Sequence, residues 1–202
     1  MFEVIPAIDV SDGALAVFTP EGPRPVEAFG GDPLAAAEAA VVVGARWLHV
    51  VDMDLAFRGE AKNLDIVAAI AALPVAVQAA GGVHGAEEVR ALLEAGATRV
   101  VLGSAALADE QAATALLSAE GPRLVAGIEV VGGRICSRGL DTVDLPLMET
   151  LGWLVSAGVP FLLVTAIDRV GERAGPDLEL VRRAGRAGRP VLAAGGVASI
   201  AD

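Results

Sequence analysis

The chain has 202 residues, and its 15 Lys and Arg residues against 26 Asp and Glu residues give a formal net charge of −11. This acidity disfavours nucleic acid as a partner, because phosphate backbones are bound by clustered positive charge. A hydrophobic content of 54% with only 20% charged residues excludes a disordered chain, and the length suits one α/β domain.

Cysteine and histidine are scarce in the chain. The single Cys136 excludes an internal disulfide, and His49 and His84 cannot supply the clustered ligands of a structural zinc site. The first residues lack the basic segment of a signal peptide. The most apolar run, Ile66–Ala80, is interrupted by a proline and a glutamine and is shorter than the ~20 residues of a membrane helix. We therefore expect a soluble cytoplasmic protein that does not enter a membrane.

Short β-branched runs alternate along the chain with Ala-, Leu- and Glu-rich stretches of helical spacing. Most of the runs are apolar throughout, which is typical of strands covered on both faces in a parallel sheet. Asp32, Gly85 and Asp177 are candidate caps at the start of three helices. This alternation predicts βα units with right-handed crossovers. In chain order we expect strand Val4–Asp9, helix Ala35–Val43, strand Trp47–Asp52, strand Val75–Ala80, helix Ala86–Ala95, strand Arg99–Leu102, helix Ala105–Leu117, strand Leu124–Glu129, helix Pro146–Ala157, strand Phe161–Thr165, helix Leu178–Ala184 and strand Val191–Ala194.

The sequence contains an internal repeat. Ala79–Val83 recurs as Ala193–Val197, 114 positions later, and Ile8–Val10 matches Ile128–Val130, 120 positions later. We interpret the chain as two homologous halves, residues 1–120 with four βα units and residues 121–202 with three. A duplicated four-unit module closes into a (βα)8 TIM barrel, so we predict a single TIM-barrel domain over residues 1–202 whose eighth βα unit is absent from this sequence. The alternative, an open doubly wound sheet, predicts no such duplication.

A barrel without its eighth unit has two unpaired strand edges. We therefore expect the 202-residue chain alone to aggregate, to dimerise through its open edge or to be inactive. One more βα unit of ~30–40 residues is expected to restore a monomeric barrel.

Two acids, Asp9 and Glu129, end the first and fifth expected strands. The two-fold repeat places them opposite each other at the mouth of the predicted barrel, where the active face of such a fold lies. That arrangement suits an acid and a base acting on one substrate from two sides. The simpler alternative is that each carboxylate only caps the turn that follows it.

Glycine-containing loops follow the third, fourth and seventh expected strands, each just before a helix. Backbone N–H groups exposed by glycine at a helix N-terminus bind phosphate, although a single Gly-Gly is usually only a tight turn. Two Gly-Gly loops suggest a small-molecule ligand with two phosphates, with Arg138 and Arg173 as local cations. The candidate phosphate-binding residues are Gly81, Gly82, Gly103, Ser104, Gly195 and Gly196.

Several segments form an ordered set: Ile5–Asp9 with Asp12-Gly13, Trp47–Asp52, Gly81–Val83, Val101–Ala106, Gly175-Pro176 and Gly195–Val197. In this order, over residues 2–202, the chain resembles the isomerases of histidine biosynthesis in the isomerase and cyclase barrel family. These enzymes convert the bisphosphorylated phosphoribosylformimino-aminoimidazole-carboxamide ribotide (ProFAR) to its ribulosyl form by an Amadori rearrangement, an aldose–ketose isomerisation. The resemblance implies acid–base catalysis without a metal or redox cofactor.

The resemblance also implies roles for single residues. Asp9 is the expected general base at the sugar C2, Glu129 occupies the position of the acid that protonates the ring oxygen, and Thr165 assists. Arg138 begins the substrate-covering loop, and Gly175 lies in a matched substrate-binding segment. The chain departs from the family pattern, which usually has Asp at position 129. The other departures are Val17, Leu140, Ala166, Val170 and Glu172.

These departures on the active face leave a second hypothesis open, a non-catalytic or reassigned barrel that binds a phosphorylated metabolite. For Asp52, Asp54 and Asp168, which follow or end strands, orientation of ligand hydroxyls and structural hydrogen bonding are equal alternatives. His49 is predicted to be a packed imidazole that supports other residues, and His84 an exposed turn residue.

Overall fold

The structure, a computed structural model, describes residues 3–19, 21–138 and 143–199. It divides into two compact units, Met1–Val100 (unit 1) and Val101–Asp202 (unit 2). Across the described ranges, no helix combines the length and apolar character needed to cross a bilayer.

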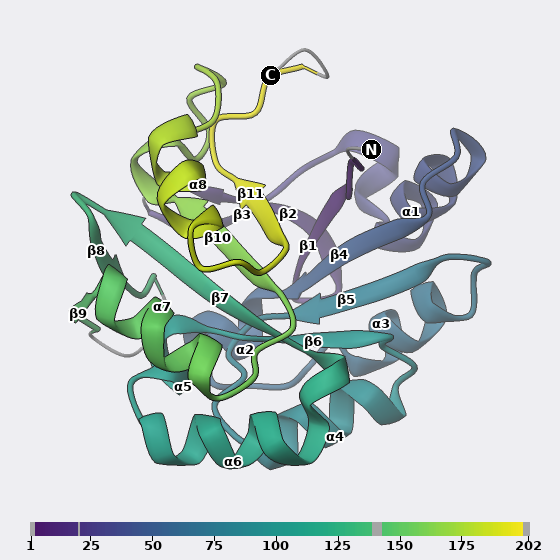
Figure 1. Cartoon of the computed structure of the whole chain (residues 1–202). Helices are drawn as coiled ribbons and strands as arrows, with labels where there is room; N and C mark the ends of the chain where they lie inside the picture. The colour runs from purple at the N-terminus through teal and green to yellow at the C-terminus, as the bar shows by residue number, and fades with distance from the viewer. Residues whose placement is uncertain (1–2, 20, 139–142, 200–202) are drawn as a thin grey trace. The chain divides into compact units, whose positions relative to one another are not determined.

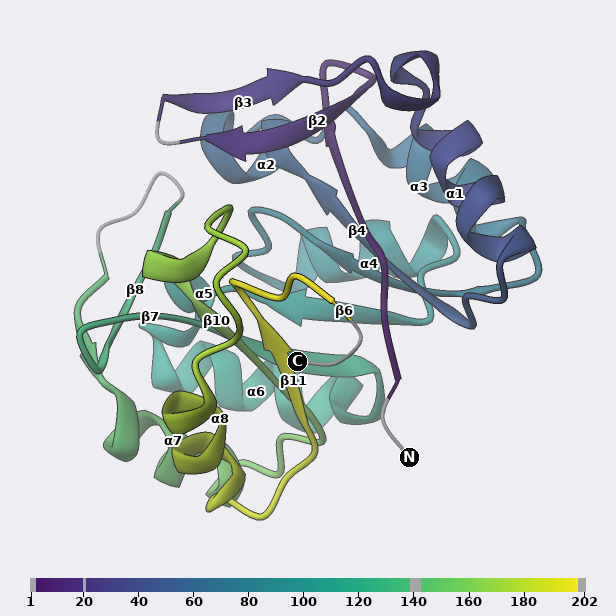
Figure 2. The same cartoon turned by 90° about the horizontal axis from the view of Figure 1, so that it is seen from above.

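Unit 1 is a parallel sheet extended by an antiparallel hairpin (Figure 1). Its strands are β1 (Ala7–Ser11), β2 (Ala14–Thr19), β3 (Gly22–Pro25), β4 (Trp47–Asp52), β5 (Ala76–Ala80) and the first two residues of β6 (Arg99–Leu102), whose last two residues belong to unit 2. The parallel strands β1, β4, β5 and β6 neighbour one another in chain order, and β2 and β3 continue the sheet beyond β1. The hairpin of β2 and β3 lies beside α2 (Figure 2), where the rings of Phe18 and Phe57 stack with centroids 5.7 Å apart.

The helices of unit 1 pack against its sheet, with α1 against α3 and α3 against α4. They are the 3-10 turn η1 (Ala28–Gly31), α1 (Pro33–Val42), α2 (Met53–Arg58), α3 (Leu64–Ala71) and α4 (Ala86–Glu94). Leu48 on β4, Ile70 on α3 and Leu92 on α4 are fully buried, so the core of this unit lies between the strands and these helices.

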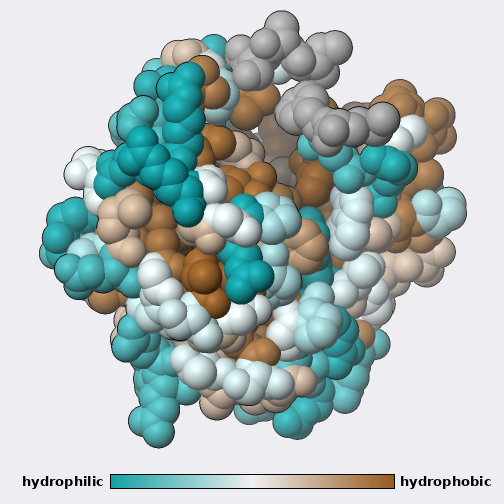
Figure 3. Space-filling view, in the orientation of Figure 1, coloured by the Kyte–Doolittle hydropathy of each residue, from teal (hydrophilic) through white to brown (hydrophobic). Residues whose placement is uncertain are grey.

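Unit 2 repeats the alternation of parallel strands and helices. Strands β7 (Leu124–Val131), β10 (Leu162–Ala166) and β11 (Val191–Ala194) are parallel and adjacent in chain order, and β8 (Arg134–Cys136) and β9 (Leu145–Pro146) continue antiparallel from β7. Its helices are α5 (Ser104–Leu107), α6 (Glu110–Glu120), η2 (Gly121–Arg123), α7 (Leu147–Ser156), η3 (Ile167–Arg169) and α8 (Leu178–Gly185). Leu124, Ile128 and Leu154 are buried in its core. The surface over α8 and the loop before it is hydrophilic (Figure 3, upper left).

The strands expected at Trp47–Asp52, Arg99–Leu102 and Val191–Ala194 are confirmed with the same bounds. The strand expected from Val4 begins only at Ala7, because Pro6 has no N–H to give to a sheet, although its carbonyl accepts from the His49 N–H at 2.8 Å.

One predicted helix is interrupted in the structure, so the prediction was wrong there. The helix expected over Ala105–Leu117 is two helices, α5 and α6, because Asp109 leaves the helical conformation (φ −99°, ψ 92°) and its side chain caps the second helix by accepting the Ala112 N–H.

The parallel strands of each unit follow one another in space in chain order, without the reversal that a doubly wound sheet requires. Parallel strands alternating with helices in this order form a mixed α/β fold of the TIM-barrel-like kind. From the sequence we did not predict the hairpin strands β2, β3, β8 and β9, nor the helices α2 and α3.

Candidate active site

Asp9 lies in β1 between two strands, opposite Ala16 of β2 and Val51 of β4. The residue is half-buried. Three positions later the chain turns sharply at Asp12-Gly13, and both turn residues have left-handed backbones (φ 48° and 78°). Positive φ at two successive residues is typical of the tight turns that join antiparallel strands.

Polar side chains from the segment after β4 hold this turn. The Asp12 N–H donates to Asp54 Oδ2 at 2.6 Å, and the Gly13 N–H donates to Asn63 Oδ1 at 3.1 Å. The Asn63 Nδ2 in turn donates to Asp54 Oδ2 at 2.9 Å and to Asp52 Oδ1 at 2.7 Å. Asp52, Asp54 and Asn63 are each 1% exposed, so these bonds satisfy polar groups that water does not reach.

Charges surround the same network. Arg58 Nη1 contacts Asp54 Oδ1 at 2.6 Å and Asp12 Oδ2 at 2.9 Å. The hydrogen bond from Arg58 lowers the pKa of Asp12, whereas burial raises the pKa of Asp52 against the opposing hydrogen bonds from Leu55 and Asn63. Of the two roles considered for Asp52 and Asp54, the structure shows structural hydrogen bonding. Asn63 and Arg58 were not recognised from the sequence, although the polar run of residues 58–63, which joins α2 to α3, was the available signal.

Both Gly-Gly loops pack closely against backbone carbonyl groups of other segments. A Cβ on Gly81 would lie 2.1 Å from the Asp52 carbonyl oxygen, and one on Gly195 would lie 2.4 Å from the Ala166 carbonyl oxygen. Asp52 and Ala166 are themselves 114 positions apart, so the contact repeats with the sequence. The second glycines are equally constrained, since a Cβ on Gly82 or Gly196 would lie 2.3 or 2.2 Å from a carbonyl oxygen.

The loop after β6 is different. Gly103 has φ −70°, and a Cβ there would meet no atom within 4 Å. Ser104 is 2% exposed, and its hydroxyl donates to the Gly127 carbonyl at 3.4 Å and accepts the Glu129 N–H at 3.2 Å. Packing therefore does not require glycine at position 103, and Ser104 connects α5 to the backbone of β7.

Glu129 is held by Arg138. Its Oε2 accepts the Arg138 N–H at 3.0 Å, and its Oε1 accepts from Arg138 Nε at 2.6 Å and Nη2 at 2.5 Å. The two side chains are 20% and 27% exposed, so the pair is largely shielded from water. Thr165 lies directly opposite Glu129 in the β7–β10 pairing and is 8% exposed. The next residues of the expected substrate-covering loop, Gly139 and Leu140, lie outside the described residues.

The loop between η3 and α8 is hydrogen-bonded to the second Gly-Gly loop. The Gly175 N–H donates to the Gly196 carbonyl at 2.9 Å, and Arg169 Nη1 donates to the Gly175 carbonyl at 3.0 Å. Arg169 was not singled out from the sequence. Arg173, a predicted cation, has a left-handed backbone (φ 51°) and is exposed in this loop.

The two histidines occupy different environments. His84 is exposed after the first Gly-Gly loop. His49 Nδ1 lies 2.9 Å from Gln78 Nε2, Gln78 accepts from Arg99 Nε at 2.7 Å, and the Arg99 guanidinium lies 4.1 Å from the ring centroid of Trp47. His49 is thus a supporting residue, as predicted. Within residues 3–19, 21–138 and 143–199, no three His, Cys, Asp or Glu side chains are grouped to hold a metal ion.

The structure brings together Glu129, Arg138, Ser104 and Thr165 in unit 2, and Gly175 with Gly195 and Gly196 in the same unit. In unit 1, Asp9 lies within β1 and the Gly81-Gly82 loop follows β5, and β1 and β5 are the two strands that flank β4.

Comparison with known proteins identifies relatives over nearly the whole chain. A family model described as "Histidine biosynthesis protein" matches residues 3–202. A protein of Salinispora arenicola named 1-(5-phosphoribosyl)-5-((5-phosphoribosylamino)methylideneamino) imidazole-4-carboxamide isomerase is 41% identical over 201 residues, which are 98% of this chain and 83% of the relative. A protein of the same name from Moorella thermoacetica is 37% identical with the same coverage, and phosphoribosyl isomerase A of Streptomyces avermitilis is 39% identical over 99% of this chain and 83% of its own length. The chain therefore belongs to the histidine biosynthesis protein family.

Proposed function

We propose that this protein is an aldose–ketose isomerase of histidine biosynthesis that converts ProFAR to its ribulosyl form. The observation that carries the proposal is the repeated Gly-Gly closure after β5 and β11, combined with the two phosphoribosyl groups in the names of its relatives. A substrate with a phosphate at each end needs two anion sites of similar construction. The sites we propose are Gly81 and Gly82 for one phosphate, and Gly175 with Gly195 and Gly196 for the other. Gly103 and Ser104 are further candidate phosphate-binding residues.

In the proposed mechanism, Asp9 removes the proton from the sugar C2, and Glu129 donates a proton to the ring oxygen as the ring opens. Thr165 assists from its position opposite Glu129. Arg138 occupies both carboxyl oxygens of Glu129. Glu129 therefore reaches the ring oxygen only after Arg138 moves away, and the anionic substrate is the competitor that draws Arg138 away.

The repeat supports a proposal about the architecture as well. We propose that residues 1–120 and residues 121–202 descend from one half-barrel module, which accounts for the matching contacts of Gly81 with residue 52 and of Gly195 with residue 166. The same origin accounts for an acid at the equivalent position of β1 and β7.

The test is turnover of ProFAR by the purified protein and by Asp9→Asn. The wild type is expected to convert the substrate, while Asp9→Asn binds it with similar affinity and loses at least ~100-fold in kcat, because the base is removed and the phosphate contacts remain. Absence of conversion by a wild type that binds substrate in calorimetry would contradict the proposal and favour the reassigned barrel.

A further inference from the structure

The hairpins that begin with β1 and β7 have the same turn. In unit 1 the turn residues are Asp12 and Gly13, with φ of 48° and 78°, and in unit 2 they are Gly132 and Gly133, with φ of 56° and 81°. The two turns are 120 positions apart, the spacing that also relates Asp9 to Glu129. Each turn therefore follows its acid at the same distance along the chain.

The support beneath the turn differs between the units. In unit 1 the side chains of Asp54 and Asn63 accept both turn N–H groups, and Asn63 is fixed by its bond to Asp52. The residues 114 positions after these three are Asp168, Asp177 and Ala166. In unit 2 the acid at the position of Asp54 is therefore kept, a second acid replaces the amide of Asn63, and alanine replaces Asp52.

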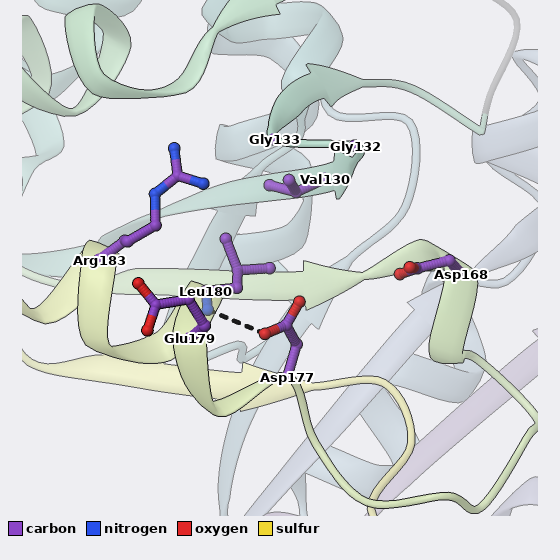
Figure 4. A pocket seen from close by; sticks show the side chains of 8 residues that line it. All are labelled: Val130, Gly132, Gly133, Asp168, Asp177, Glu179, Leu180 and Arg183. Carbon is purple, nitrogen blue, oxygen red and sulfur yellow. Dashed lines mark hydrogen bonds between the residues drawn. The ribbon is translucent and has the colours of Figure 1, made fainter.

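In unit 2 a cavity of about 150 Å³ lies where the first unit has this network. Figure 4 shows Asp168 and Asp177 on one side of it and the Gly132-Gly133 turn on the other. Asp177 accepts the Leu180 N–H at 2.9 Å as the cap of α8, and among the described residues no hydrogen bond joins the two carboxylates to the turn. Two ionised carboxylates cannot hydrogen-bond to each other, whereas an amide and a carboxylate can.

The cation is lost too. Arg58, which neutralises Asp54 and Asp12 in unit 1, corresponds to Glu172 in unit 2. Among the described residues that line the cavity, Arg183 is the one cation.

We infer that Asp54 and Asn63 are positioning residues for Asp9, whereas Glu129 has lost the equivalent support and is positioned by Arg138. The inference rests on the proposed function for the role of Asp9. Asp9 lies on a strand paired on both sides, and the anchored turn three residues later fixes where that strand leaves the sheet. A shift of about 1 Å in a catalytic group costs about 100-fold in rate, so anchoring of this kind is needed for proton transfer.

The test is Asn63→Asp, which keeps the shape of the side chain but removes both hydrogen bonds that Asn63 donates. It also places a third carboxylate beside the buried Asp52 and Asp54, so the side chain is expected to leave the turn. Hydrogen exchange at the Asp12 and Gly13 amides should accelerate at least ~10-fold. The kcat for ProFAR should fall about 10- to 100-fold with little change in KM, because substrate binding uses other residues.

A carbon-13 NMR measurement follows Asp9 without relying on turnover. Its carboxyl resonance is expected to move in Asn63→Asp. The matched control is Asp177→Asn at the equivalent position of unit 2, which should leave the Asp9 resonance and the exchange at Asp12 and Gly13 unchanged. If Asn63→Asp does not fold, Asp54→Asn serves instead, since it keeps an acceptor for the Asp12 N–H but weakens that bond by removing its charge.

Each outcome decides one part of the inference. Wild-type amides at Asp12 and Gly13 that exchange as fast as those at Gly132 and Gly133 would overturn the difference in support. Faster exchange in the variant with an unmoved Asp9 resonance and wild-type kcat would overturn the positioning role. A wild type without turnover contradicts the proposed function alone, because the exchange rates and the resonance still test the support and the position of Asp9.

Discussion

Replacing single glycines by alanine separates the glycines that the fold requires from Gly103, which the fold does not require and which we propose to bind a phosphate. Gly81→Ala places a Cβ 2.1 Å from the Asp52 carbonyl oxygen on a backbone with φ +107°. The left-handed backbone costs about 1–2 kcal/mol for a residue with a Cβ. The overlap forces the end of β4 away from β5 and adds about 1–3 kcal/mol.

The expected loss for Gly81→Ala is therefore about 2–5 kcal/mol, a large part of the ~5–15 kcal/mol that stabilises a typical domain. The matched control is Gly103→Ala. At position 103 the backbone has φ −70° and a Cβ meets nothing within 4 Å, so stability should stay equal or rise by up to ~1 kcal/mol as the unfolded chain loses freedom.

The assay is urea unfolding followed by circular dichroism, together with calorimetric titration of ProFAR. Gly103→Ala is expected to fold normally but to bind the substrate more weakly, because its methyl group occupies the space proposed for a phosphate. Equal unfolding midpoints for the two variants would refute the steric reasoning. Undiminished binding by Gly103→Ala would remove Gly103 from the proposed phosphate site.

Two further predictions concern the networks of the two units. In Arg58→Gln the donor that lowers the pKa of Asp12 is missing, so the wild type should be more stable than the variant at pH values above the ordinary pKa of 3.8. This difference in stability should vanish as the pH falls through the lower pKa of Asp12 in the folded protein. Urea unfolding midpoints of both proteins between about pH 2 and pH 7 measure the difference, and a difference that does not depend on pH would contradict the prediction. Ala166→Asp alone should destabilise the protein by about 1–3 kcal/mol, because it buries a carboxylate without an amide partner. The double variant Ala166→Asp with Asp177→Asn should recover this loss through a coupling energy of about 1–3 kcal/mol. Additive effects in the double-mutant cycle would show that the unit 1 network cannot be rebuilt in unit 2.

The parallel strands were predictable because each is a short, mostly apolar run, and β6, β7 and β10 are buried at nearly every residue. The hairpin strands were not, since β3 contains two prolines in four residues and β8 has only three residues, and neither has a period that a sequence can display. The equivalence of Asp9 and Glu129 followed from the repeat. The prediction that each acid ends its strand was wrong, because β1 continues to Ser11 and β7 continues to Val131.

The partners of these acids did not follow from the repeat. Arg138 was assigned to a substrate loop from the resemblance, but its bonds to Glu129 depend on the bend of the chain after β8, which no local pattern encodes. Asn63 lies at the end of a polar connection that reads as an ordinary loop. Only the fold brings it to the Gly13 N–H, 50 positions earlier in the chain.

The hydroxyl of Ser104 links α5 to β7 within unit 2. It accepts the Glu129 N–H while its own residue begins α5, directly after the open backbone of Gly103. An anion bound at the proposed Gly103-Ser104 site would therefore bear on β7, which carries the proposed acid Glu129. A substrate analogue that lacks the phosphate proposed for this loop is expected to lose kcat as well as affinity, as happens when remote binding energy is used to align a reacting group.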